Sequence, residues 1–224
     1  MDLAALKYDE SGLVTVVVQD RLTGEVRMLA HANEPALRAT LASGEGHFYS
    51  RSRKALWRKG ETSGHVLRVS EVWADCDADA VLYLVDPEGP SCHTGRTSCF
   101  FRRVGGGGEV HDDPAAHGRS LLPRLWSELE ARRSADAASS YTRTLLQAGA
   151  GRIGAKIREE ADELARAIEG ESDARVASEA ADVVYHLLVG LLARGLDVRT
   201  VFAELARRIG TSGLAEKASR RRES

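Results

Sequence analysis

The residues with the clearest chemical potential form the run Asp75-Cys76-Asp77-Ala78-Asp79. In an extended chain alternate side chains share a face, so the three carboxylates converge while the thiol of Cys76 points the other way. Carboxylates at this spacing repel one another unless a cation neutralises them. Hard oxygen donors favour Mg²⁺ and a soft thiolate favours Zn²⁺. The alternative is a solvated acidic turn with a buried cysteine.

Two further cysteines make zinc the stronger interpretation. Six residues lie between Cys92 and Cys99, enough for one loop to present two thiolates to one metal, with Cys76 as the third ligand. Three protein ligands leave the fourth position of a tetrahedral zinc open, as in catalytic zinc sites. A water bound there ionises near pH ~7 and becomes a nucleophile. His93, beside Cys92, is a candidate for proton transfer, for a further ligand, or for a neighbour of the ligands.

A second acidic set lies in a helical pattern further along the chain. Glu160 and Glu163 lie along one edge of an apolar helical stripe, and after fifteen intervening residues Glu179 and Asp182 repeat the spacing. If the two helices pack antiparallel, these carboxylates meet, and Mg²⁺ bound through carboxylates and substrate phosphates offsets their repulsion. For Glu159 and Glu160 taken alone, a solvated helix face is the more common explanation.

Composition restricts the function classes. The chain has 224 residues, 43% of them hydrophobic, and 31 basic against 33 acidic residues give a formal charge of −2. This balance argues against nucleic-acid binding, which needs a basic surplus. The longest apolar stretch, Val183–Ala193, is well below the ~20 residues of a membrane span, and the N-terminus lacks a signal-peptide pattern. We therefore expect a cytoplasmic enzyme with no membrane or nucleic-acid partner.

The region from Gly12 to Phe101 is rich in short β-branched runs that are typical of strands. A helix is predicted from Asn33 to about Leu41, with Asn33 as its N-cap and Pro35 in its first turn. The first half is thus expected to be mainly β, of α+β type. Strands are predicted at 14–18, 25–30, 66–72 and 81–85.

The second half has a different pattern. From Leu121 onward no strand pattern remains, and helical runs separated by glycines predict an up-and-down bundle. Between the halves, Gly105–Gly108 predicts a flexible linker over 105–118, because a phosphate loop needs a helix directly after it, whereas polar residues and Pro114 follow here. The expected domains are 1–104 and 119–224. Helices are predicted at 121–131, 141–147, 152–168, 176–193 and 198–209.

Four segments of the first half resemble phosphoribosyl-AMP cyclohydrolase: Ser50–Arg53, Leu56–Gly64, Asp75–Asp77 and Gly89–Gly95. The resemblance covers Gly12 to Arg102 and implies hydrolytic opening of the six-membered adenine ring by zinc-activated water. It implies small-molecule phosphoribosyl nucleotides as substrates and a homodimer whose two subunits share each zinc site.

The resemblance to phosphoribosyl-AMP cyclohydrolase also implies roles for individual residues. His93 is the candidate catalytic residue. His65 stands where the family usually has asparagine, and Ala78 where glycine is common. The zinc ligands are Cys76, Cys92 and Cys99, and the Mg²⁺ ligands are Asp75, Asp77 and Asp79. The residues expected to bind phosphoribosyl groups are Arg51, Arg53, Lys59, Glu61, Thr62 and Ser63.

Three segments of the second half resemble phosphoribosyl-ATP pyrophosphatase, an α-helical nucleotide pyrophosphohydrolase: Ser140–Thr142, Lys156–Glu160 and Glu179–Leu188. The resemblance runs from about Leu121 to Ala218. It implies that Glu159 orients or deprotonates the attacking water. The candidate contacts for substrate phosphates are Arg132, Arg133, Lys156 and Arg158, for each of which an ordinary surface charge is the alternative. The implied Mg²⁺ ligands, which would grip the triphosphate, are Glu160, Glu163, Glu179 and Asp182.

The two resemblances name consecutive steps of histidine biosynthesis. The product of the second half would be the substrate of the first, which predicts a bifunctional hydrolase. The alternative is a metal-binding regulatory module in which one or both catalytic sites are inactive. The intact sets of metal donors in both halves argue against that alternative.

Overall fold

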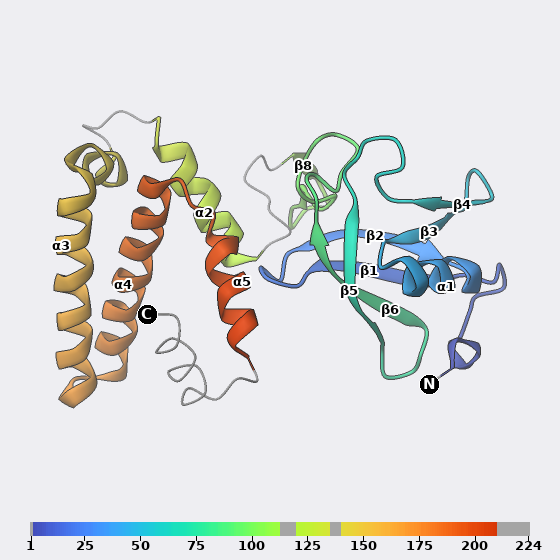
Figure 1. Ribbon diagram of the computed structural model, residues 1–224, viewed down its shortest axis with the longest axis horizontal. Coiled ribbons are helices and arrows are strands. Elements are labelled where there is room, and N and C mark those ends of the chain that lie inside the picture. The colour runs from blue at the N-terminus through green and yellow to red at the C-terminus, as the bar shows by residue number, and fades with distance from the viewer. Residues whose placement is uncertain (1, 113–119, 135–139, 210–224) are drawn as a thin grey trace, which may run out of the picture. The chain divides into compact units, whose positions relative to one another are not determined.

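The computed structural model describes residues 2–112, 120–134 and 140–209, and its chain divides into two compact units, Met1–Arg124 and Leu125–Ser224. The first unit is built mainly of strands and the second of helices (Figure 1). The predicted fold class, a strand-rich α+β part followed by an all-α part, is therefore confirmed. Each unit is described by itself.

A four-stranded mixed sheet forms the centre of the first unit, in the order β2-β1-β6-β5. β1 pairs in parallel with β6, and the two outer pairs are antiparallel. Along β1 alternate residues are buried, as expected for a strand with one face on the core. The four predicted strands are thus confirmed. Their bounds are β1 (Val14–Asp20), β2 (Val26–Ala32), β5 (Leu67–Ala74) and β6 (Ala80–Pro87).

The predicted helix is α1 (Glu34–Ser43), which covers part of this core. The Asn33 side chain accepts a hydrogen bond from the backbone N–H of Ala36 at 3.0 Å, so it is the N-cap that the sequence predicts. Gly44 ends the helix at a φ of 67°, a left-handed conformation that glycine adopts at little cost.

A short hairpin that the sequence pattern did not predict follows α1. It consists of β3 (His47–Ser50) and β4 (Ala55–Arg58), which pair antiparallel. Phe48 of β3 is fully buried, and its ring lies 5.1 Å from that of Trp57 and 5.7 Å from that of Tyr83, measured between centroids. The hairpin is therefore packed on the core. A single 3-10 turn, η1 (Leu3–Ala5), precedes the sheet.

The glycine run lies in the turn of a second hairpin, between β7 (Arg102–Val104) and β8 (Val110–Asp112). The N–H of Gly105 donates to the carbonyl of Glu109 at 2.8 Å, which closes the turn. For this part of the predicted linker, the backbone freedom of glycine permits a tight turn instead of a flexible tether. Residues 113–118 lie outside the described part, and the domain boundaries remain a prediction.

The second unit contains four helices among the described residues, and α3 and α4 pack side by side (Figure 1). α3 joins the two predicted runs 141–147 and 152–168 into one element that is kinked at Gly149, where φ is 82° and ψ is 179°. The arginines at 220–222 lie outside the described part. The helices are α2 (Leu121–Arg132), α3 (Tyr141–Gly170), α4 (Asp173–Arg194) and α5 (Val198–Arg208).

Among the described residues, α4 alone is long and apolar enough, by length and composition, to cross a membrane. Core helices pass the same test, so this is weak evidence. α4 also carries Glu179, Asp182 and His186, and charged groups at these positions would be costly in a bilayer.

Candidate active sites

A cavity of about 530 Å³ lies in the strand-rich unit, between the segment after β4 and the loop 89–99. It brings together two of the three cysteines and most of the predicted substrate-binding residues. Arg51 is not among its lining residues. The predicted residues that line it are Arg53, Lys59, Glu61, Thr62, Ser63, Cys92, His93 and Cys99.

The two thiols of this cavity have different electrostatic surroundings. Burial acts to raise the pKa of Cys92, but hydrogen bonds from the Thr94 side chain, at 3.1 Å, and from the Thr94 backbone outweigh it, so that pKa is lowered. Cys99 is solvent-accessible, yet the cavity walls remove enough water to raise the pKa of its thiol to about 11. The two side chains are also hydrogen-bonded to each other. Adjacent thiols that need a cation to ionise together fit a soft metal such as zinc.

The Lys59 side chain is held in the cavity by a backbone carbonyl of the same segment. Burial lowers the pKa of Lys59, whose ammonium donates to the carbonyl of His65 at 3.2 Å. The His65 ring lies against Gly89, so closely that a Cβ atom at position 89 would come within 2.5 Å of the ring nitrogen Nδ1. His65 therefore helps to shape the cavity wall at the position where the family usually has asparagine.

Asp75, Asp77 and Asp79 lie in the exposed turn between β5 and β6, and one carboxylate oxygen of each lies within 4.8 Å of the others. The charges of Asp77 and Asp75 raise the pKa of Asp79, whereas the N–H of Ala80 lowers the pKa of Asp75. The carboxylates thus converge as the spacing predicts, and they fit a hard divalent cation.

Ala78 and Cys76 lie between these aspartates, and the backbone conformation of the first and the exposure of the second bear on the predicted metal sites. Ala78 adopts a φ of 65°, in the left-handed region that glycine favours, so its side chain costs about 1 kcal/mol of strain where the family usually has glycine. Cys76 is exposed. Within the described residues of one chain, Cys76 does not form a close group with Cys92 and Cys99.

A buried charged group beneath the thiol loop was not predicted from the sequence. Arg27 of β2 is 6% exposed, and its guanidinium lies 2.7 Å from the Glu25 carboxylate. It also donates to the hydroxyl of Ser91 at 3.1 Å and to the carbonyl of Gly89 at 3.0 Å. The N–H of Cys99 donates to the Arg27 carbonyl at 2.8 Å. Arg27 thereby connects the sheet to both ends of the loop.

We expect Arg27→Met to lower the free energy of unfolding of the strand-rich unit by about 3 kcal/mol or more, since it leaves Glu25 buried without its cation. Denaturant titration followed by tryptophan fluorescence measures this loss. The matched control is Arg38→Met, which removes an exposed pair with Glu34 and should cost less than about 1 kcal/mol. Equal losses in the two variants would contradict this account of the buried group.

In the helical unit, α3 and α4 bring Glu160, Glu179 and Asp182 together, with one oxygen of each within 4.8 Å of the others. Glu160 is 7% and Glu179 2% exposed, and burial raises the pKa of Glu179. Glu163, the fourth predicted ligand, is not in this close group; its carboxylate is partly exposed and lies 3.8 Å from the Arg175 guanidinium. The antiparallel arrangement expected from the spacing is present, and two buried carboxylates beside the exposed Asp182 fit a divalent cation. We call these four residues the helical carboxylate group.

Cations of the chain border the helical carboxylate group on both sides. The Lys156 ammonium lies 2.6 Å from Glu160 and 2.9 Å from Glu159, which sits on the exposed side of α3 outside the group. Arg175 of α4 lies 2.7 Å from Glu179. Arg158, also predicted to bind phosphate, is exposed.

His186 of α4 is buried beside the same group. Its Nδ1 donates to the Asp182 carbonyl at 2.8 Å and lies 3.9 Å from a Glu160 oxygen. Its Nε2 is 3.3 Å from the Tyr141 hydroxyl. His186 therefore fixes the start of α3 against the carboxylates of α4.

Comparison with known proteins identifies both units. Residues 28–101 match the family model of phosphoribosyl-AMP cyclohydrolase, and residues 122–209 match that of phosphoribosyl-ATP pyrophosphohydrolase. With the thiol cavity in one unit and the helical carboxylate group in the other, these matches define a bifunctional hydrolase.

Relatives that match nearly the whole chain identify the family to which it belongs. The chain is 44% identical to the histidine biosynthesis bifunctional protein of Wolinella succinogenes, over 98% of this chain and 97% of that protein. It is 45% identical to the protein of the same name from Thermus thermophilus, over 88% of each chain. It is 38% identical to the chloroplastic protein of Arabidopsis thaliana, over 97% of this chain and 80% of that protein. The chain belongs to the family of bifunctional histidine biosynthesis enzymes, as the sequence analysis predicted.

Proposed function

We propose that the helical carboxylate group binds Mg²⁺ and cleaves phosphoribosyl-ATP, and that the thiol cavity binds zinc and opens the ring of the phosphoribosyl-AMP that is formed. The observation that carries this proposal is that each unit brings its own set of metal-type donors together. A regulatory module with inactive sites is not favoured, since both family models match and the donors are intact.

In the helical unit, Glu160, Glu163, Glu179 and Asp182 hold the cations that face the triphosphate. Lys156 pairs with Glu160 and, together with Arg158, supplies positive charge for substrate phosphates. Glu159 is the group that orients or deprotonates the attacking water. Positioning and charge neutralisation on the leaving pyrophosphate account for most of the rate in such a reaction.

In the strand-rich unit, Arg53 and Lys59 supply charge for the phosphoribosyl groups, and Glu61, Thr62 and Ser63 line the same wall. Arg51 does not line the cavity, so it contacts only a part of the substrate that extends out of the cavity. His93 is placed for proton transfer, with its Nδ1 3.9 Å from the Cys92 sulfur. Asp75, Asp77 and Asp79 hold a further Mg²⁺. When bound, zinc lowers the pKa of a coordinated water and Mg²⁺ neutralises phosphate charge.

We propose that the zinc site is completed by Cys76 of a second copy in a cytoplasmic homodimer. Within one chain the exposed Cys76 is not grouped with the other two cysteines, so a third thiolate at that zinc has to come from elsewhere. Three protein ligands leave one position open for water.

Elemental analysis combined with sedimentation tests the metal and dimer proposals together. We expect about one zinc per chain and a dimer that a strong chelator strips of zinc. Ring opening should then stop, while pyrophosphate release continues once Mg²⁺ is restored. A zinc-free monomer with full ring-opening activity would overturn both proposals.

A further inference from the structure

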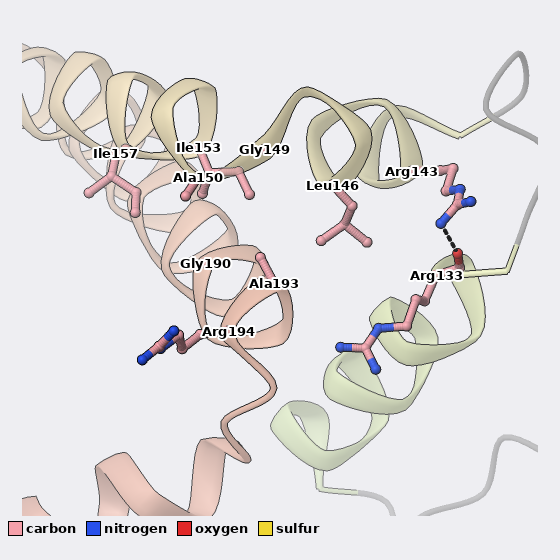
Figure 2. Close-up of a pocket in the computed structure, with 11 residues that line it drawn as sticks. Arg133, Arg143, Leu146, Gly149, Ala150, Ile153, Ile157, Gly190, Ala193 and Arg194 are labelled. Carbon is pink, nitrogen blue, oxygen red and sulfur yellow. Dashed lines mark hydrogen bonds between the residues drawn. The ribbon is translucent and has the colours of Figure 1, made fainter.

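A second cavity, of about 520 Å³, lies in the helical unit beside the helical carboxylate group. Figure 2 shows α3 and α4 on one side of it and the end of α2 with the start of α3 on the other. Ile157 lines the cavity and lies three residues, less than one helical turn, before Glu160. The cavity therefore leads away from the carboxylates along α3.

Arginines and apolar side chains line this cavity. The apolar wall is formed by Leu146, Ala150, Ile153, Ile157 and Ala193, and the arginines are Arg133, Arg143 and Arg194. Arg133 donates to the carbonyl of Leu192 at 2.5 Å and Arg143 to that of Arg133 at 2.7 Å. In the described part of the chain, no carboxylate forms an ion pair with any of the three arginines, whereas Lys156 and Arg175 nearby are both paired.

Arg133 and Arg143 are held by neutral carbonyls, and no carboxylate of the described residues compensates their charge. Each guanidinium has five N–H donors, and one carbonyl uses only a small part of them. The kink at Gly149 also restarts the helix at Ala150, on the cavity wall, which puts the partially positive end of that segment at the cavity. This combination of uncompensated cations with an apolar wall suits a phosphorylated ligand that carries a sugar or a base.

We propose that this cavity binds the phosphoribosyl group by which phosphoribosyl-ATP differs from ATP, with Arg133 and Arg143 on its phosphate. The inference rests on the proposed function, because it places the triphosphate at the helical carboxylate group. From Ala150 to Glu160, α3 rises by about 15 Å, which separates the two anionic ends of one extended substrate. The apolar wall between them contacts ribose and adenine.

Pyrophosphate release from phosphoribosyl-ATP and from ATP tests this assignment in the full-length protein. We expect Arg133→Ala/Arg143→Ala to lower kcat/KM for phosphoribosyl-ATP roughly 10- to 100-fold, mainly through KM, because charge-assisted hydrogen bonds to the phosphate are lost. We expect the unmutated protein to act much more slowly on ATP, and this slow reaction should not change in the double variant, so discrimination between the two substrates falls. Ribose 5-phosphate should inhibit the unmutated protein competitively and the double variant far less.

Matched controls separate this role from a structural one. Arg166→Ala removes an exposed arginine of α3 outside the cavity and should leave all these values unchanged. An unchanged helical signal in circular dichroism reports that the helical unit of the double variant is folded, and lysine at both positions should restore part of the affinity. An unchanged KM with unchanged ribose 5-phosphate inhibition, or an equal loss on both nucleotides, would overturn the inference. An unmutated protein that releases no pyrophosphate from phosphoribosyl-ATP would instead contradict the proposed function.

Discussion

Cys92→Ser is expected to abolish ring opening of phosphoribosyl-AMP, by at least about 100-fold, because serine is a far weaker zinc ligand than thiolate at neutral pH. Cys92 is buried in the thiol cavity, and its pKa is lowered by the hydrogen bonds from Thr94, so it is the thiol best prepared to bind metal. Zinc content, measured by elemental analysis, should fall in parallel. Pyrophosphate release from phosphoribosyl-ATP should remain, so that phosphoribosyl-AMP accumulates.

The matched control for this substitution is Ser98→Ala, in the same loop. Ser98 is buried and donates to the carbonyl of Val26 at 2.7 Å, so its loss perturbs the loop without removing a thiol. It should retain zinc and a large part of the activity. Full ring opening by Cys92→Ser protein that demonstrably lacks zinc would show that Cys92 is not a metal ligand of the reaction.

Glu179→Gln is expected to slow pyrophosphate release on the order of 100-fold or more, while ring opening remains nearly normal. The substitution keeps the shape of the side chain but removes one negative charge from the most buried member of the helical carboxylate group. Mg²⁺ affinity should fall with it, since carboxylates are the ligands that this ion prefers. Initial rates over a Mg²⁺ titration measure both effects.

Glu171→Gln provides the comparison for that variant. Glu171 also pairs with Arg175, at 3.5 Å, but it is exposed and outside the helical carboxylate group. Its substitution should change neither the rate nor the Mg²⁺ dependence. If Glu171→Gln slows pyrophosphate release as much as Glu179→Gln does, the ion pair with Arg175 matters and the proposed metal site does not.

Local patterns were sufficient to predict most of the regular elements. Alternating β-branched residues predicted β1 and β6, and an asparagine followed by proline predicted the start of α1, because these features act within a few residues. The hairpin of β3 and β4 was missed since each strand has only four residues, and their stability comes from Phe48 packed on the distant Tyr83. Gly149 predicted a break between two helical runs, and its non-helical backbone does separate two helical segments within α3.

The same difference between local patterns and contacts of distant residues decides which parts of the candidate sites could be predicted. The convergence of the aspartates was predicted from an extended chain, whereas the turn between β5 and β6 brings them together. The convergence of the helical carboxylates was predicted from their spacing on the condition that the two helices pack antiparallel. The Arg27 group could not, since its hydrogen bond to Ser91 joins residues 64 positions apart. The arginine-lined cavity depends on how separate helices pack, which no local pattern encodes. The proposed sharing of a zinc site between two copies came from the family resemblance and not from the spacing of residues in one chain.

The most direct test of two consecutive sites in one chain is a product time course with phosphoribosyl-ATP as the only substrate, followed by chromatography with Mg²⁺ and zinc present. The account predicts release of pyrophosphate, a transient rise of phosphoribosyl-AMP, and its complete conversion to the ring-opened product. Stoichiometric accumulation of phosphoribosyl-AMP by zinc-loaded protein, or phosphoribosyl-ATP that stays intact, would contradict it.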